Sequence, residues 1–345
     1  MRNCSLLLAL ILFLGLSSCS DDQEIRPSFY HWKSSFSPGG SELDALQSLE
    51  VDRLYIRYFD VDLAPGGEAA RPISKLQSKA SFPEETELVP CIFVTNRCIK
   101  AMEADAIPAL AENIFDQVFS LQEQLAFPAP QEVQIDCDWT PSTQERYFSL
   151  LDHLRPLLAG KGCKLSCTIR LHQFKYPQQT GVPEVDRGML MVYNVGNLDD
   201  PNEENSIFDL GTIRSYLSPN TEYPLTLDVA LPIFGWGVLI REGKPIRLLN
   251  NLHMEDALAD SLLEKTSQTQ VEVLQSHYFY GRYLYAGDKI RFESVSAGDL
   301  VAGAELVAEA LPKQANRHIA LYHLDSLSLQ KYAFDTLEIV YRAFR

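Results

Sequence analysis

The feature that most constrains the fold is a regular alternation of short apolar segments with longer amphipathic ones. Eight segments have the apolar, β-branched or aromatic character of strands: 28–35, 53–62, 87–95, 132–139, 163–171, 188–194, 224–231 and 317–323. Several are apolar without a break, as expected of parallel strands that are buried on both faces. Between them, apolar residues recur at three- and four-residue steps, most clearly over 106–126, and this spacing predicts helices that pack by one face.

Two further helices are predicted from local signals. The segment 141–159 begins with Pro141 and carries Ser142 and Glu145 at the spacing of a capping box. The last helix is expected over 326–343. Eight strand–helix alternations are typical of an α/β fold of the (β/α)8 barrel kind. A doubly wound open sheet is the alternative, but the first strand lacks the glycine-rich phosphate loop that would favour it.

The barrel is expected to be a single domain over 28–345. Its seventh and eighth predicted strands are separated by an unusually long connection, rich in tyrosine at 277–292. Connections of that length within a compact domain usually have structure of their own or form a lid. We therefore predict an insertion in the barrel at about 237–312.

The N-terminus has the pattern of an export signal. Arg2 precedes a short apolar run, and Leu16-Ser17-Ser18-Cys19 follows it. The run is shorter than the roughly 20 residues that cross a bilayer, and small residues precede the cysteine, so residues 1–18 are predicted to be a removable signal peptide. The last four residues resemble the lipobox of bacterial lipoproteins, which implies a lipid on Cys19, a tether over 19–27 and a place on the outer membrane or cell surface. An ordinary signal peptide with a free Cys19 is the alternative.

The charge of the chain limits its partners. Its formal net charge of −16 would repel a phosphate backbone, which disfavours nucleic acid. Cys163 and Cys167 have a spacing that metal sites use, but neither a histidine nor a second cysteine pair lies at the spacing of a zinc finger. No metal and no cofactor are predicted. A metal site built from His31, His172 and His323 with Asp62 or Asp138 remains an alternative.

The fourth predicted strand carries two carboxylates on one face. Side chains alternate along a strand, so Gln134, Asp136 and Asp138 share a face, and Ile135 and Cys137 share the other. Two carboxylates confined in a barrel repel each other, which raises the pKa of one of them. A carboxyl that keeps its proton beside an ionised one is the equipment for cleaving a glycosidic bond.

The same strand resembles a known family. VQIDCDW followed by a helix resembles the fourth strand of chitinase-type glycoside hydrolases, in which aspartates alternate and a catalytic glutamate follows two residues later. Asp136 and Asp138 match the two aspartates, but Thr140 stands where the glutamate belongs. The whole chain also resembles an uncharacterised family of bacterial lipoproteins with glycosidase-like barrels. The resemblance implies a (β/α)8 barrel and a glycan or oligosaccharide as the ligand.

Active sites of such barrels lie at the carboxyl ends of the strands. We therefore expect hydrolysis of a glycan centred on Asp138 as proton donor and Asp136 as charge stabiliser. The residues expected to line the substrate cleft, or to offer ring platforms for sugars, lie near other predicted strand ends: Trp32, Arg57, Asp60, Trp139, Arg170, His172, Tyr193, Asp228 and Trp236.

Three other interpretations are kept open. Asp138 could be the acid/base with Asp228 as nucleophile, although Asp228 is expected to lie deep in its strand. The chain could bind a glycan or a protein without catalysis, because the glutamate is missing. Asp136 and Asp138 could also be paired with Arg57 and Arg170 in a closed interior that has only a structural role.

Overall fold

The computed structural model describes residues 25–64, 66, 70–200, 202–217 and 223–345. Eight parallel strands form a closed barrel, because β1 pairs with both β18 and β3. The predicted (β/α)8 barrel is confirmed, and each strand lies where the sequence places it to within a few residues. The barrel strands are β1 (Ile25–His31), β3 (Arg53–Leu63), β6 (Glu87–Val94), β7 (Glu132–Asp136), β8 (Lys164–Arg170), β9 (Arg187–Met191), β10 (Leu227–Pro232) and β18 (Arg317–Tyr322).

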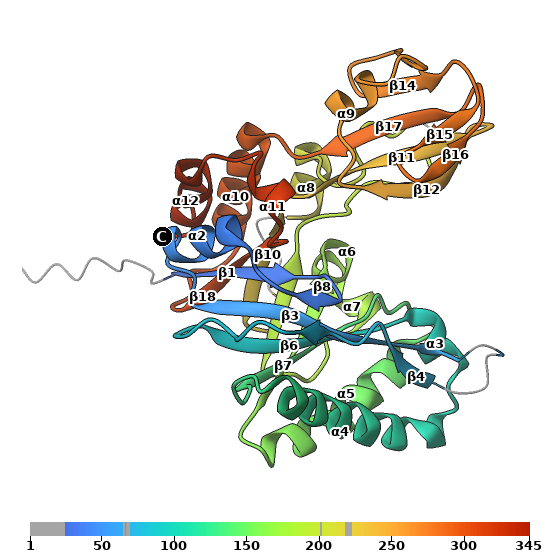
Figure 1. Ribbon diagram of the computed structural model, residues 1–345. Helices are drawn as coiled ribbons and strands as arrows, with labels where there is room; N and C mark the ends of the chain where they lie inside the picture. The colour runs from blue at the N-terminus through green and yellow to red at the C-terminus, as the bar shows by residue number, and fades with distance from the viewer. Residues whose placement is uncertain (1–24, 65, 67–69, 201, 218–222) are drawn as a thin grey trace, which may run out of the picture.

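Helices connect the strands on the outside of the barrel (Figure 1). They are α2 (Gly40–Ser48), α3 (Asn96–Ala101), the 3-10 turn η1 (Ala104–Ala106), α4 (Ile107–Leu125), α5 (Gln144–Ala159), α6 (Leu171–Lys175), α7 (Pro177–Thr180), α8 (Leu210–Tyr216), α10 (Ala297–Ala310), α11 (Ser326–Leu329) and α12 (Phe334–Arg342). Among the described residues, every helix falls short of the length and apolar character needed to span a bilayer.

Two predicted helices differ from those observed. The helix expected from residue 141 begins at Gln144, because the hydroxyl of Thr143 accepts a hydrogen bond from the backbone of Thr140 and holds a turn there. The capping-box prediction is therefore wrong. The helix expected over 326–343 is broken into α11 and α12. In the break, the hydroxyl of Tyr332 turns inward and donates to the carbonyl oxygen of Val295 at 2.8 Å.

The predicted insertion between the seventh and eighth barrel strands is an antiparallel sheet with a small core of its own. Figure 1 shows it above the barrel. Its elements are β11 (Gly235–Arg241), β12 (Lys244–Asn250), α9 (Met254–Leu258), β13 (Leu263–Lys265), β14 (Gln270–Val273), the hairpin of β15 (His277–Phe279) and β16 (Arg282–Leu284), and β17 (Lys289–Ser294). The sheet ends at Ser294, earlier than expected, because α10 packs with α8 and α12 as a barrel helix.

Three short strands complete the structure outside the barrel and the insertion. β4 (Ala70–Ile73) adds to β3 in the antiparallel sense, and β2 (Ser35–Phe36) pairs with β5 (Gln77–Ser78). These pairs lie in the connections after β1 and β3, where they build up the rim of the barrel beside the carboxyl ends of its strands.

Candidate active site

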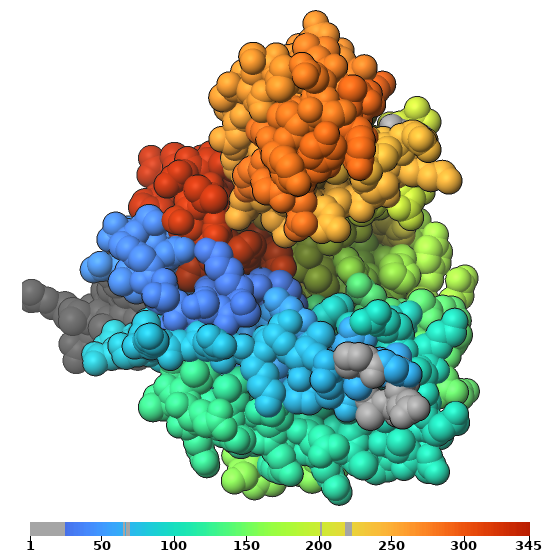
Figure 2. Space-filling model, turned by 45° about the vertical axis from the view of Figure 1, so that its right-hand side comes forward, coloured from blue at the N-terminus to red at the C-terminus, as the bar shows by residue number. Residues whose placement is uncertain are grey.

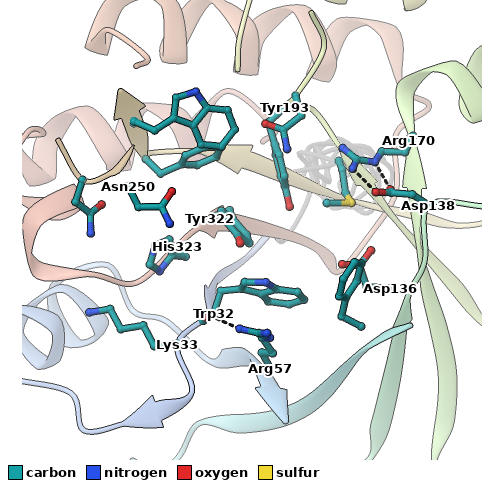
Figure 3. A pocket seen from close by; sticks show the side chains of 17 residues that line it. Trp32, Lys33, Arg57, Asp136, Asp138, Arg170, Tyr193, Asn250, Tyr322 and His323 are labelled. Atoms are coloured by element: carbon teal, nitrogen blue, oxygen red, sulfur yellow. Dashed lines mark hydrogen bonds and ion pairs between the residues drawn. The ribbon is translucent and has the colours of Figure 1, made fainter. Parts of the chain in front are cut away.

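A cleft of about 460 Å³ opens at the carboxyl ends of the barrel strands, beneath the insertion. Figure 2 shows the hollow between the insertion and the barrel, and Figure 3 shows its side chains. The cleft is lined by Trp32, Lys33, Arg57, Phe93, Asp136, Asp138, Arg170, Met191, Tyr193, Asn194, Phe234, Gly235, Trp236, Asn250, Asn251, Tyr322 and His323. Seven of the predicted site residues therefore meet in one place: Trp32, Arg57, Asp136, Asp138, Arg170, Tyr193 and Trp236.

Aromatic side chains form a continuous wall of the cleft. The ring centroids of Trp32 and Tyr322 lie 5.8 Å apart, and those of Tyr322 and Tyr193 lie 5.1 Å apart. Phe234 continues the row, 5.4 Å from Tyr322 and 5.2 Å from Trp236. Trp32 and Tyr193 follow β1 and β9, Tyr322 ends β18, and Phe234 and Trp236 lie at the start of the insertion. Each ring is held by the next, so the wall offers fixed apolar faces to a ligand.

Trp236 is oriented by a buried carboxylate of the insertion. Its indole Nε1 donates to Glu293 at 3.0 Å, and Arg291 donates to the other oxygen of Glu293 at 2.7 Å. Glu293 and Arg291 are both buried. The insertion thus fixes the position of the tryptophan at the mouth of the barrel.

The carboxylates of Asp136, which ends β7, and of Asp138, two residues later, have different surroundings. Arg170 donates from Nε and Nη2 to both oxygens of Asp138, at 2.5 and 2.7 Å, so Asp138 is paired as an anion. Asp136 is buried and accepts a hydrogen bond from the hydroxyl of Thr168 at 2.7 Å. Burial, followed by the charge of Asp138, raises the pKa of Asp136 to about 6. Asp136, deeper in the barrel, is thus the carboxyl that can hold a proton near neutral pH.

Arg57 is paired with a carboxylate next to the cleft. It forms a two-pronged ion pair with Asp60, and its guanidinium carbon lies 5.9 Å from the centroid of a ring of Trp32. Asp60 is buried beneath Arg57 and does not line the cleft. One interpretation paired both aspartates with Arg57 and Arg170 in a closed interior. Only the pair of Asp138 with Arg170 is observed, because Arg57 pairs with Asp60 instead and the cleft is open.

Two other predicted residues lie beside the cleft or beneath its surface. Trp139 is 3% exposed, stacks on Tyr147 and donates from Nε1 to the carbonyl oxygen of Thr180. Our prediction of Trp139 as an open sugar platform is therefore wrong. His172 is exposed and lines a smaller adjoining hollow with Asp138 and Arg170.

Asp228 lies at the other end of the barrel. It is the second residue of β10, it is 1% exposed, and it accepts hydrogen bonds from Arg187 at 2.6 Å and from the backbone of His318 at 2.8 Å. Both partners begin neighbouring strands. The placement of Asp228 in the substrate site, as nucleophile or ligand, is therefore wrong.

Several cleft residues were not assigned to the site from the sequence. Lys33 lies just after β1, and Tyr322 and His323 lie at the end of β18. Their place near strand ends is a sequence signal from which they could have been assigned to the site. Asn250 and Asn251 come from the insertion, for whose position the sequence holds no comparable signal. Burial lowers the pKa of His323 to about 4, so the side chain is neutral at pH 7.

The described residues offer no cluster of three or more His, Cys, Asp or Glu side chains that could hold a metal ion. His31, His172 and His323 thus do not meet with a carboxylate in a metal-binding arrangement. The five cysteines of the described residues are buried thiols without disulfides. Cys19 lies outside the described residues.

The comparisons with known proteins concern the fold of the chain. No protein-family model matches the chain, and no curated protein matches its sequence. Among solved structures, a class V chitinase from Nicotiana tobaccum in complex with NAG4 is similar over 92% of this chain and 98% of its own, with a TM-score of 0.52 and 11% identity. The spore cortex-lytic enzyme SleL of Bacillus megaterium covers 94% of this chain and 75% of its own, with a TM-score of 0.52 and 13% identity.

A third structure, the chitinase-like agglutinin of Robinia pseudoacacia, covers 92% of this chain and 99% of its own, with a TM-score of 0.50 and 12% identity. The fold is that of the chitinase-type glycoside hydrolases. At these identities the likeness concerns the backbone, and a chitinase-type barrel carries both enzymes and an agglutinin among these neighbours. Activity must therefore be argued from the side chains of the cleft.

Proposed function

We propose that the chain binds an oligosaccharide in the cleft of its barrel, and that a lipid on Cys19 holds it on the outer membrane or cell surface. The observation that carries the glycan proposal is the row of contacting rings beside a pair of carboxylates. An aromatic face is negatively polarised and attracts the C–H groups on the flat side of a sugar ring. Carboxylates, arginines and asparagines then bind the hydroxyl groups, as fits a site with few, well-placed polar groups.

Binding without turnover is the mode best supported by the side chains. Thr140 occupies the position of the family's catalytic glutamate, and its hydroxyl contacts those of Ser142 and Thr143 instead of lining the cleft. Asp138, our expected proton donor, accepts hydrogen bonds from Arg170 on both of its oxygens. A threonine hydroxyl is too weak an acid to protonate a leaving group, and the carboxylate of Asp138 is occupied by Arg170, so neither residue is placed to act as a general acid.

Hydrolysis is the second candidate, and one observation favours it. Asp136 lines the cleft with a pKa raised to about 6, mainly by burial. In this version the roles expected from the sequence are exchanged, with Asp136 as the acid and Asp138 as the charged partner. A proton-holding carboxyl beside an ionised one is then available without the glutamate.

The test is calorimetric titration of the purified chain with a panel of short oligosaccharides, including NAG4, followed by mass spectrometry for cleavage products. We expect saturable binding, weakened about tenfold in Trp236→Ala by loss of one ring contact. Tyr176→Ser, an exposed tyrosine outside the cleft, is the matched control and should bind as the wild type does. Failure of the wild type to bind any member of the panel would contradict the proposal.

The same panel separates the two modes. Products released by the wild type but not by Asp136→Asn, with binding retained, would establish hydrolysis through Asp136. Equal product release from both would exclude it.

The lipid anchor is tested separately. Cells fed a clickable palmitate analogue should label the wild-type chain and not Cys19→Ser, and equal labelling of the two would contradict lipidation at Cys19.

A further inference from the structure

The hairpin of the insertion exposes an unusual number of tyrosines. Five tyrosines are exposed among the described residues, and four of them lie within 278–285. They are Tyr278 at 79%, Tyr280 at 47%, Tyr283 at 44% and Tyr285 at 51% exposure. Scattered exposed rings are ordinary, but a group on one short hairpin marks a binding surface.

The strand register puts three of these rings on one face. Tyr278 of β15 is directly opposite Tyr283 of β16, so the two share a face, and Tyr285 follows two residues after Tyr283. Leu284 and Phe279 point the other way, into the core of the insertion. We call the outer surface of Tyr278, Tyr283 and Tyr285 the tyrosine face.

The rings of the tyrosine face are held in place before any ligand arrives. The centroids of Tyr278 and Tyr283 are 5.1 Å apart, as are those of Tyr283 and Tyr285, both with edge-to-face geometry. The guanidinium of Arg241 lies 4.3 Å from the centroid of Tyr285 and is itself held by Asp288 through two hydrogen bonds of 2.8 Å. Fixed rings lose little conformational entropy on binding.

The hairpin is also joined to the rim of the cleft. Tyr280, in the turn between β15 and β16, donates its hydroxyl to the carbonyl oxygen of Asn250 at 2.9 Å. Asn250 and Asn251 line the cleft. Figure 1 shows β15 and β16 next to β12, the strand that ends at Asn250. One ligand long enough to leave the cleft past Asn250 would thus come to the hairpin.

We infer that the tyrosine face is a second carbohydrate-binding surface, which holds the continuation of a polysaccharide whose end occupies the cleft. The inference rests on the proposed glycan binding in the cleft and adds a preference for polymers over short oligosaccharides. Tyrosine suits this role because its ring stacks on the C–H face of a sugar while its hydroxyl binds sugar hydroxyls. Two sites on one chain of sugars raise the affinity through effective concentration.

A carbohydrate is favoured over a second copy of the chain. The three rings of the tyrosine face carry hydroxyls, which can bind the hydroxyl groups of a sugar. Two copies would each bring a net charge of −16, and this repulsion opposes association through a small face. The contact between Tyr280 and Asn250 places the hairpin next to the cleft. This position allows one long glycan to occupy both surfaces, whereas binding of a separate protein partner would not require it.

The test is co-sedimentation of the full chain with four insoluble polymers: chitin, cellulose, xylan and bacterial peptidoglycan. We compare the wild type with the double variant Tyr278→Ser/Tyr283→Ser, whose replaced side chains are exposed and so leave the core intact. The wild type should sediment with at least one polymer, and the double variant should bind it about tenfold more weakly. Tyr176→Ser, which replaces a tyrosine about as exposed as Tyr283 but outside the hairpin, should keep the wild-type affinity.

Titration with short oligosaccharides separates this inference from the function of the cleft. The double variant should bind them as the wild type does, whereas Trp236→Ala should bind them about tenfold more weakly. Equal sedimentation of wild type and double variant, or no sedimentation of the wild type with any polymer, would overturn the inference and leave the cleft proposal to its own titration. Wild-type dimers in analytical ultracentrifugation that the double variant lacks would also overturn it, in favour of self-association.

Discussion

Arg170 donates two hydrogen bonds to Asp138, at 2.5 and 2.7 Å, and thereby gives Asp138 surroundings that differ from those of Asp136, the last residue of β7. Asp138 is fixed as an anion at the cleft surface, where 47% of its side chain is exposed. Asp136 is buried two residues earlier on the same face of the strand, next to that negative charge. Burial first, and then the neighbouring charge of Asp138, therefore raise the pKa of Asp136.

Asp138→Asn should lower the pKa of Asp136. The substitution removes the negative charge that raises this pKa and frees the positive charge of Arg170, which lowers it. The carboxyl carbon of Asp136, followed by NMR against pH, should titrate at a lower midpoint than in the wild type. Thr168→Val is the opposite control, because it removes a hydrogen bond that stabilises the charged form, so its midpoint should rise. An unchanged midpoint in Asp138→Asn would refute the electrostatic coupling.

Asp136→Asn should stabilise the protein at neutral pH. The pKa of Asp136 is raised from 3.8 to about 6, so the folded state binds a proton that the unfolded state has released between these values. Stability of the wild type therefore falls as pH rises through this window, and asparagine removes the fall. We expect a gain of roughly 2–3 kcal/mol in the free energy of unfolding at pH 7, absent below about pH 4.

Asp62→Asn is the control of opposite sign for that measurement. Hydrogen bonds from Arg97 hold the pKa of Asp62 well below its usual range. The folded state is thus stabilised above the unfolded pKa, and this contribution is lost as pH falls through the acid range. Asp62→Asn should destabilise the protein at pH 7 and less so in acid. Urea unfolding at several pH values measures both variants, and curves that shift in the same direction would refute the assignment.

Asp228→Asn should cost stability and leave glycan binding unchanged. Asp228 closes the amino end of the barrel by pairing with Arg187, and it is 1% exposed. Removing a buried charge leaves its partner unpaired, at a cost of about 3 kcal/mol. Titration of the folded variant with an oligosaccharide should give the wild-type affinity, because the residue is outside the cleft. Weaker binding by the folded variant would restore Asp228 to the site.

The barrel could be predicted because each strand and helix shows its own period in the sequence. The alternation that put Asp136 and Asp138 on one face also puts Trp139 with Cys137 on the other, against α5. The burial of Trp139 could therefore be predicted from the alternation, whereas the closeness of Trp139 to the strand end wrongly suggested an exposed position. Asp228, by contrast, is the fifth residue of the predicted strand 224–231 but the second residue of β10, which begins at Leu227, so its place at the amino end of the barrel depends on where the strand begins.

Other features of the site depend on contacts between segments far apart in the sequence. The choice of Arg170 as the partner of Asp138 follows from the three-dimensional positions of the side chains at the ends of two neighbouring strands. Asn250 reaches the cleft because an antiparallel sheet folds back over the barrel mouth. A sequence predicts the existence of such a sheet more readily than its register or its position.

Gly303→Ala should destabilise the protein even though alanine is the better helix former. A Cβ at Gly303 in α10 would lie 2.3 Å from the ring of Phe208, which is 4% exposed and fixed in the barrel core. The overpacking costs about 1–3 kcal/mol, which exceeds the gain of about 1 kcal/mol in helix propensity. Gly298→Ala, in the same helix, is the matched control, because its nearest neighbour would be 3.9 Å away. Guanidinium unfolding should show a lower midpoint for Gly303→Ala and an equal or higher one for Gly298→Ala. Midpoints that rise in both variants would mean that Phe208 moves aside, and that α10 is not packed rigidly on the barrel.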